Sequence, residues 1–75
     1  MNSDIDIFPN PAKSELYFRN ISQNTTISIS KINGEIIHVG SLYDNKIDVN
    51  NLLKGIYLLK IYDRNNVTIK RFVKE

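Results

Sequence analysis

The sequence predicts an all-β domain of about seven short antiparallel strands. Strand-forming isoleucine is the commonest residue and turn-forming asparagine the next, whereas the chain has a single alanine, so good helix formers are scarce. Polar and apolar residues alternate in short runs, as they do in half-buried strands. The runs recur at roughly ten-residue spacing between turn-forming residues, which is typical of a β-sandwich.

Each expected strand is one of these runs, bounded by residues that favour turns. In chain order they are Asp4 to Phe8, Glu15 to Asn20, Thr26 to Ser30, Glu35 to Val39, Lys46 to Val49, Ile56 to Tyr62 and Val67 to Val73. The first ends at Pro9 and Pro11, because proline fixes φ and lacks the amide proton that a strand donates.

The turns between the strands also have sequence signals. Asn33-Gly34 is a favoured pair for a tight hairpin turn. Ile32 is out of phase with the preceding alternation, which predicts a bulge near this turn. The cluster from Asp63 to Asn66 predicts a second turn, so the last two strands should pair antiparallel.

Seven short strands are most economically packed as two sheets face to face, because a single sheet would leave one apolar face in water. We therefore expect an immunoglobulin-like β-sandwich. Leu52, Gly55 and Tyr57 have the spacing of a tyrosine corner, in which a tyrosine near the start of the sixth strand donates a hydrogen bond to backbone upstream. Tyr57, Leu59 and Ile61 should then share one face and enter the core.

Length and composition exclude several classes of protein. With 75 residues the chain forms one domain, residues 1–75. It has no cysteine, which excludes disulfides, thiolate metal sites and cysteine nucleophiles. The net charge of +2 is spread along the chain, which argues against nucleic-acid binding. No apolar run approaches the ~18 residues of a membrane span, and the first residues do not form a secretory signal.

The sequence offers little for catalysis, and we expect no enzyme and no cofactor. His38 is the only histidine, and Ser41 and Asp44 near it are more simply explained as turn formers. Two acidic groups could contact calcium, but neither matches the twelve-residue calcium loop, and solvated surface residues are the favoured interpretation. These groups are Asp4 with Asp6, and Asp44 with Asp48 and Asn50.

Three aromatic residues, Phe18, Tyr43 and Tyr62, could form a platform for stacking on a sugar. They lie on different segments, so packing in the core or at its rim is favoured. The stretch from Thr68 to Glu75 alternates bulky apolar residues with cations. This pattern fits either an edge strand protected by charge or a recognised C-terminal tag.

Three pieces of the sequence together resemble the type A C-terminal sorting domain of the type IX (Por) secretion system of Bacteroidota. They are Phe8-Pro9-Asn10-Pro11-Ala12, then Leu52 to Tyr57 with the apolar run to Ile61, and Lys70-Arg71-Phe72-Val73-Lys74. The resemblance spans nearly the whole chain and implies an immunoglobulin-like module that is not an enzyme. It also implies that an outer-membrane translocon reads the domain and that a sortase-like peptidase removes it outside the cell, releasing the cargo or attaching it to the surface.

The resemblance also implies roles for particular residues. The positions that match the family pattern are Pro9, Asn10 and Pro11, Gly34, Gly55 and Tyr57, and Lys70, Val73 and Lys74. Gly34, Leu52, Gly55 and Tyr57 look architectural. The translocon is expected to recognise Lys70, Arg71, Phe72, Val73 and Lys74 directly, by strand addition at the terminal edge.

Family members are exported behind an N-terminal signal and a cargo domain, and this sequence has neither. We therefore expect it to be the end of a larger secreted protein. The alternative is a sandwich module of a secreted enzyme that binds carbohydrate or protein. That alternative predicts an exposed aromatic or acidic patch, and binding that survives loss of the terminal lysines.

Overall fold

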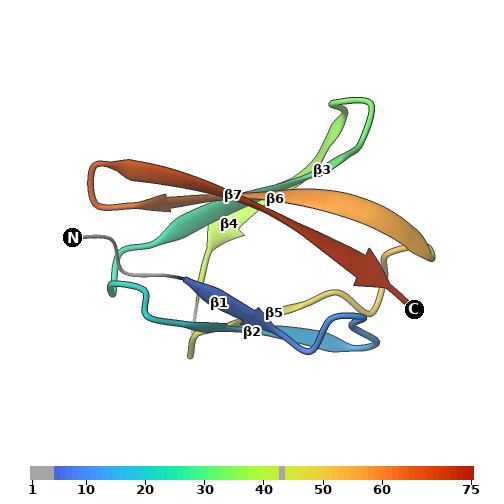
Figure 1. Ribbon diagram of the computed structural model, residues 1–75, viewed down its shortest axis with the longest axis horizontal. Helices are drawn as coiled ribbons and strands as arrows, with labels where there is room; N and C mark the ends of the chain where they lie inside the picture. The colour runs from blue at the N-terminus through green and yellow to red at the C-terminus, as the bar shows by residue number, and fades with distance from the viewer. Residues whose placement is uncertain (1–4, 43) are drawn as a thin grey trace.

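The computed structural model describes residues 5–42 and 44–75, which form seven β-strands and no helix (Figure 1). The strands are β1 (Asp6–Phe8), β2 (Glu15–Arg19), β3 (Thr26–Lys31), β4 (Ile36–Ser41), β5 (Lys46–Asp48), β6 (Gly55–Asp63) and β7 (Asn66–Lys74). Each predicted strand is present, with ends that differ by one or two residues. Asp4, the predicted start of the first strand, lies outside the described residues.

The strands form two antiparallel sheets that pack face to face, as the sequence predicts (Figure 1). One has three strands in the order β1-β2-β5, and the other has four in the order β4-β3-β6-β7. Strands β6 and β7 form a long hairpin, with pairs from Gly55↔Lys74 to Asp63↔Asn66. Strand β7 therefore lies at one edge of the larger sheet. No helix of the described residues is long and apolar enough to cross a membrane.

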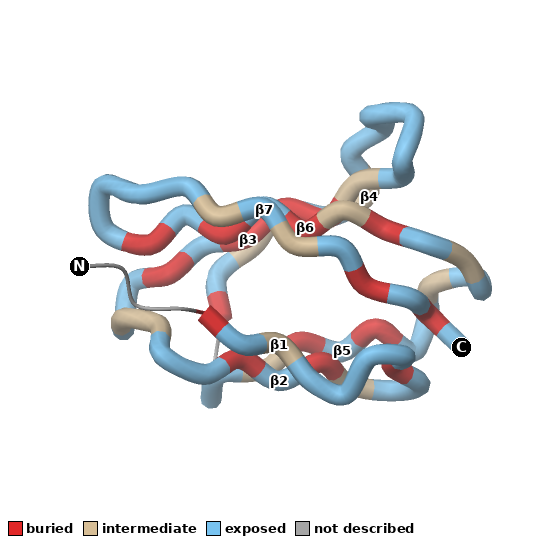
Figure 2. The backbone as a smooth tube through the Cα atoms, in the orientation of Figure 1, coloured by how far each residue is buried: buried red, intermediate tan, exposed pale blue. Residues whose placement is uncertain are grey.

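The core lies between the sheets, and buried residues alternate with more exposed ones along strands such as β2 and β6 (Figure 2). Tyr57, Leu59 and Ile61 of β6 are buried together, which confirms the predicted inward face. The largest fully buried side chains are Phe72, Leu16, Ile27, Ile29, Leu59 and Ile61. Because the domain is small, a few such residues from both sheets account for most of the apolar surface that folding removes from water.

The β3–β4 turn explains why Ile32 breaks the alternation of polar and apolar residues that precedes it. The amide of Gly34 donates to the carbonyl of Lys31 at 2.9 Å, and the amide of Lys31 donates to the carbonyl of Glu35 at 2.9 Å. The loop thus has three residues and ends at Gly34, whose φ is +96°. The pairing of β3 with β4 shifts register between Ile29 and Ser30, which confirms a bulge close to the turn.

The tyrosine corner is present. The Tyr57 hydroxyl donates a hydrogen bond of 2.6 Å to the carbonyl of Leu53, four residues upstream. Leu52 is partly buried and packs on the core beside it. The corner anchors the loop that enters β6 and holds the Tyr57 ring in the core.

The outer face of the three-stranded sheet is covered by paired charges and rings. Lys46 forms an ion pair with Glu15 at 3.3 Å, and the Tyr17 hydroxyl donates to the Glu15 carboxylate at 2.7 Å. The ring of Tyr17 stacks on Phe8, and the Arg19 guanidinium lies 4.6 Å from the centre of the Phe8 ring. The Tyr17 hydroxyl and Lys46 hold the pKa of Glu15 below its ordinary value. Both signs of charge are matched on this face, as on an ordinary solvated surface.

Candidate functional site

The Pro-Asn-Pro segment lies against the last residues of the chain, more than sixty positions away in sequence. The Asn10 side chain accepts a hydrogen bond of 2.9 Å from the amide of Val73 and donates one of 3.2 Å to the carbonyl of Arg71. The Ala12 amide donates to the Val73 carbonyl, and the Glu75 amide donates to the Ala12 carbonyl, both at 2.8 Å. We call this set of four hydrogen bonds the terminal clasp.

The clasp works because the outer edge of β7 presents backbone groups that need partners. The Asn10 side-chain amide donates through its nitrogen and accepts through its oxygen, so it pairs with β7 as a neighbouring strand would. Ala12 continues the pairing as a short parallel bridge opposite Lys74. Pro9 and Pro11 flank Asn10, and the peptide bonds that precede both prolines are cis.

The five residues expected to be recognised directly divide between two faces of β7. Phe72 is fully buried, and its ring stacks on Tyr57 with the ring centres 5.6 Å apart. Lys74 is also buried, and its ammonium donates to the Glu75 carbonyl at 3.1 Å. Lys70 lies on the same side, opposite Leu59, and is half-buried. Arg71 and Val73 point to solvent on the other side.

The Gly-x-Tyr motif, Gly55 to Tyr57, lies at the same end of the domain as the terminal clasp. In the β6–β7 pairing Gly55 lies opposite Lys74, and Tyr57 lies opposite Phe72. Gly55 has φ +154°, a conformation that side-chain-bearing residues rarely adopt. The closing motif, residues 70–74, therefore contacts both the opening motif, residues 8–12, and the middle motif, residues 52–61. Gly34 is the exception, since it belongs to the β3–β4 turn.

The clasp covers only the last part of the β7 edge. It pairs the outward backbone groups of Arg71, Val73 and Glu75. Further up the strand Val67 and Ile69 present their backbone groups at the same edge, and no other strand of residues 5–42 and 44–75 pairs there. An added strand would find this upper part open and the lower part occupied.

The candidate catalytic and metal residues are not brought together. His38 is exposed on β4, and Asp44 has φ +57°, as in a turn. The Asp48 carboxylate accepts a 2.8 Å hydrogen bond from the amide of Asn50, which is a local turn contact. Within the described ranges, no group of three or more histidine, cysteine or acidic residues could hold a metal ion.

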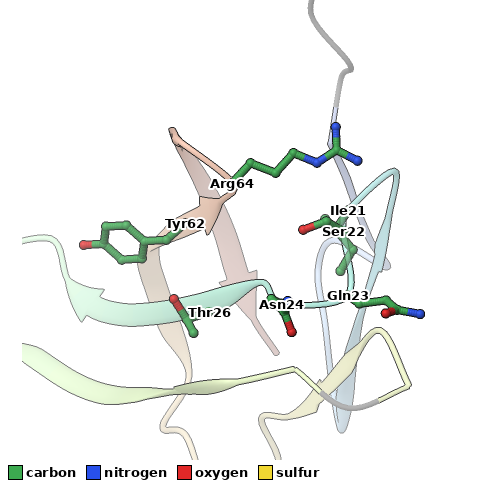
Figure 3. A pocket seen from close by; sticks show the side chains of 7 residues that line it. All are labelled: Ile21, Ser22, Gln23, Asn24, Thr26, Tyr62 and Arg64. Carbon is green, nitrogen blue, oxygen red and sulfur yellow. The ribbon is translucent and has the colours of Figure 1, made fainter.

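The aromatic platform is not formed by the residues that the structure describes. Phe18 is buried in the core, Tyr62 is partly exposed, and Tyr43 lies outside the described residues. Tyr62 borders an open hollow of about 710 Å³ with Arg64 and the β2–β3 connection (Figure 3). The side chains there spread in different directions instead of converging on one point, and Tyr62 is the only ring among them.

A buried carboxylate next to this hollow joins the β2–β3 connection to β6. Asp63 Oδ1 accepts hydrogen bonds from the Ser22 hydroxyl, from the Ser22 amide at 3.1 Å and from the Thr25 hydroxyl at 3.0 Å. The Ser22 hydroxyl contributes most to a lowered pKa of Asp63, and burial partly opposes it. The ionised form is therefore the one that the folded state stabilises.

Asp63→Asn should lower the free energy of unfolding at neutral pH by about 1–3 kcal/mol, because it weakens bonds to a charged acceptor. The stabilisation by Asp63 is present above the ordinary aspartate pKa of about 3.9, and it is lost as the pH falls through the lowered folded pKa. Urea unfolding followed between pH 2 and pH 7 checks this. The variant should show a weaker loss of stability in acid, as should Ser22→Ala, and an unchanged acid slope in both would contradict the assignment.

The fold and the contact between the Pro-Asn-Pro segment and the last strand define a small immunoglobulin-like sandwich module. The family model described as "Secretion system C-terminal sorting domain" matches residues 6–75, and the chain belongs to this family. No curated protein matches the chain.

Membership of this family defines the function. The domain is the C-terminal sorting signal for type IX secretion, and it marks cargo for export across the outer membrane to the cell surface or the extracellular space. The family is not known as enzymatic. Sequence reasoning found the three motifs but not their contact, because nothing local to Asn10 signals a partner at Arg71 and Val73.

Proposed function

We propose that the type IX translocon reads this domain as a folded object, at the end of β7, and not as an unfolded peptide tag. A cargo domain would precede residues 1–75, and a sortase-like peptidase would separate the two after export. The observation that carries the proposal is the terminal clasp, in which Asn10 and Ala12 hold Arg71, Val73 and Glu75 in place.

The alternation along β7 supports a division of labour among the five residues of the closing motif. The inward Phe72 and Lys74 stabilise the end of the sandwich, so their effect on recognition would be indirect. The outward Arg71 and Val73, with the half-buried Lys70, are the groups that a partner can touch. In the proposal these three make the contact, and the clasp fixes where they point.

The clasp also limits how a translocon could add a strand. The edge beside Val73 is already paired with the opening segment, so strand addition is confined to the stretch around Val67 and Ile69 unless Asn10 is displaced. Edge protection by charge remains compatible with this arrangement, since Arg71 discourages unspecific pairing while serving a specific partner.

The test is a fusion of an export signal and a fluorescent reporter ahead of residues 1–75, expressed in a host with or without a working type IX translocon. Arg71→Glu should abolish surface delivery of the reporter while leaving the circular dichroism and the urea midpoint of the domain nearly unchanged. The matched control is Arg19→Glu, which makes the same charge change on the opposite sheet. It should be exported normally.

Point substitution is preferable to deletion of Lys70 to Glu75, because deletion would also remove Phe72 from the core. Export of Arg71→Glu at the wild-type level would contradict recognition at this strand. Export of the wild-type fusion without a translocon would contradict the proposed dependence altogether.

A further inference from the structure

The outer face of the four-stranded sheet carries apolar side chains where a solvated sheet would carry polar ones. On β6 and β7 the residues that alternate with the core residues point to this side, and most of them are apolar. The exposed apolar residues of the face are Ile36, Val39, Ile56, Tyr62, Val67, Ile69 and Val73. Val39 is 68% exposed and Ile69 59% exposed, so no part of the described chain covers them.

The cross-strand pairs show that these residues form one surface. Val39 of β4 pairs with Ser28, Ser28 pairs with Lys60, and Lys60 pairs with Ile69, so this row crosses all four strands. On the same face Tyr62 lies opposite Val67, and Ile56 lies opposite Val73. We call this surface the outer apolar face.

Only two charged side chains, Lys60 and Arg71, belong to the paired positions of this face. Ile69 faces Lys60 and is two residues from Arg71, so Lys60 and Arg71 are diagonal neighbours on the sheet, with Cα atoms roughly 7–8 Å apart. The ion pairs of the described residues are Lys31 with Glu35 and Lys46 with Glu15, so neither cation is neutralised within the domain. The face is thus apolar with an uncompensated positive centre.

The opposite face of the sandwich shows that this is not a general property of the domain. There Lys46 has Glu15 as a partner, and Arg19 lies over Phe8. A large apolar surface on one face only is typical of an interaction site.

We propose that the outer apolar face docks on a protein partner that presents aliphatic side chains around a carboxylate, with the carboxylate placed between Lys60 and Arg71. The proposal rests on the proposed function in one respect, since the partner is sought within the export machinery. The two unpaired cations call for a carboxylate on the partner, because opposite charges attract. The aliphatic residues around the cations call for aliphatic side chains around that carboxylate.

Two other occupants fit the face less well. A second copy, packed about a two-fold axis, would bring the same two cations against their own equivalents with no acid on the face to pair with them. A lipid surface would take up the aliphatic side chains, but it would bury Lys60 and Arg71 in the middle of the contact, with apolar neighbours around them. A carboxylate held by a protein avoids both problems.

The experiment places the photocross-linker p-benzoyl-phenylalanine in the reporter fusion at Tyr62 or at Tyr17, in a host with a working translocon. The two sites are matched, because both are tyrosines of similar exposure, 40% and 36%, on opposite faces of the sandwich. Tyr62 should give an adduct with one component of the export machinery, and Tyr17 should give none. Mass spectrometry of the adduct should map an aliphatic partner segment that contains Asp or Glu.

The charge requirement is tested by adding Lys60→Glu to the Tyr62 cross-linker, which should lower the adduct yield about tenfold or more. Lys60→Gln serves as the second variant if the acidic residue disturbs folding, and it should give an intermediate yield. An adduct that is insensitive to both variants, equal adducts from Tyr17 and Tyr62, or adducts only with lipid or with a second copy would overturn the inference. A wild-type fusion that is exported without any Tyr62 adduct overturns this inference alone, whereas a fusion that is not exported overturns the proposed function.

Discussion

Phe72→Ala is expected to leave the domain largely unfolded at 25 °C. Phe72 has no exposed surface, and it stacks on the Tyr57 ring at the end of the domain where the Pro-Asn-Pro segment contacts β7. Truncation of a buried phenylalanine typically costs about 3–5 kcal/mol. A core of this size rarely supplies more than about 3–5 kcal/mol in total, and the chain has no disulfide to add to it. One side chain therefore accounts for most of the margin.

Urea unfolding followed by circular dichroism measures this effect against two graded controls. Phe72→Leu keeps most of the apolar volume and should cost about 1–1.5 kcal/mol. Tyr57→Phe keeps the stacked ring and removes only the hydrogen bond to the Leu53 carbonyl, so it should cost about 1 kcal/mol. A stable Phe72→Ala domain, with a midpoint close to that of the wild type, would mean that this end of the sandwich contributes little to folding.

Because Phe72 is buried, an export experiment at this residue does not separate recognition from folding. A variant at Phe72 that fails to be exported would show only that a folded domain is required. A variant at Arg71, on the outward side of the same strand, separates recognition from folding. Because inward and outward residues alternate along β7, substitutions within residues 70–74 test two different properties. Inward substitutions test folding, and outward substitutions test recognition.

Most of the fold could be predicted from the sequence, because strands, turns and the tyrosine corner have local signals. The period of two in Thr26 to Ser30 predicts the inward side chains of Ile27 and Ile29, and both are buried. Leu52, Gly55 and Tyr57 predict the corner through their spacing alone, since the donor and the acceptor are only four residues apart. Ile32 predicts the bulge because it breaks the alternation.

The arrangement of the site could not be predicted, because it depends on which sheet edge the opening segment reaches. Asn10 is a common turn residue, and its bonds to Arg71 and Val73 depend on two sheets being packed first. One part did have a usable signal. Phe72 is in phase with Lys70 and Lys74, and its strand pairs with the one that carries Tyr57, so the period of two would have placed the ring in the core.

Gly55→Val is expected to cost about 1–3 kcal/mol, as a residue forced into a sparsely populated backbone conformation does. Gly55 has φ +154°, and in sequence it lies between Leu53 and Tyr57, whose carbonyl and hydroxyl groups form the hydrogen bond of the corner. A Cβ built there meets nothing within 4 Å, so the cost comes from the backbone and not from crowding. Gly55→Ala should consequently lose a similar amount, with valine at the upper end because β-branched residues tolerate positive φ least.

The chain is short enough for chemical synthesis, which allows a control of opposite chirality. D-alanine at position 55 adopts positive φ as readily as L-alanine adopts negative φ, so it should retain the stability of the wild type. Equal losses from L-alanine and D-alanine would show that the added methyl group, and not φ, is the problem, which would contradict the open space around Gly55. If L-alanine alone is destabilising, the corner requires a backbone turn that only glycine supplies among natural residues, and the Gly-x-Tyr spacing then follows from the hydrogen bond between Tyr57 and Leu53.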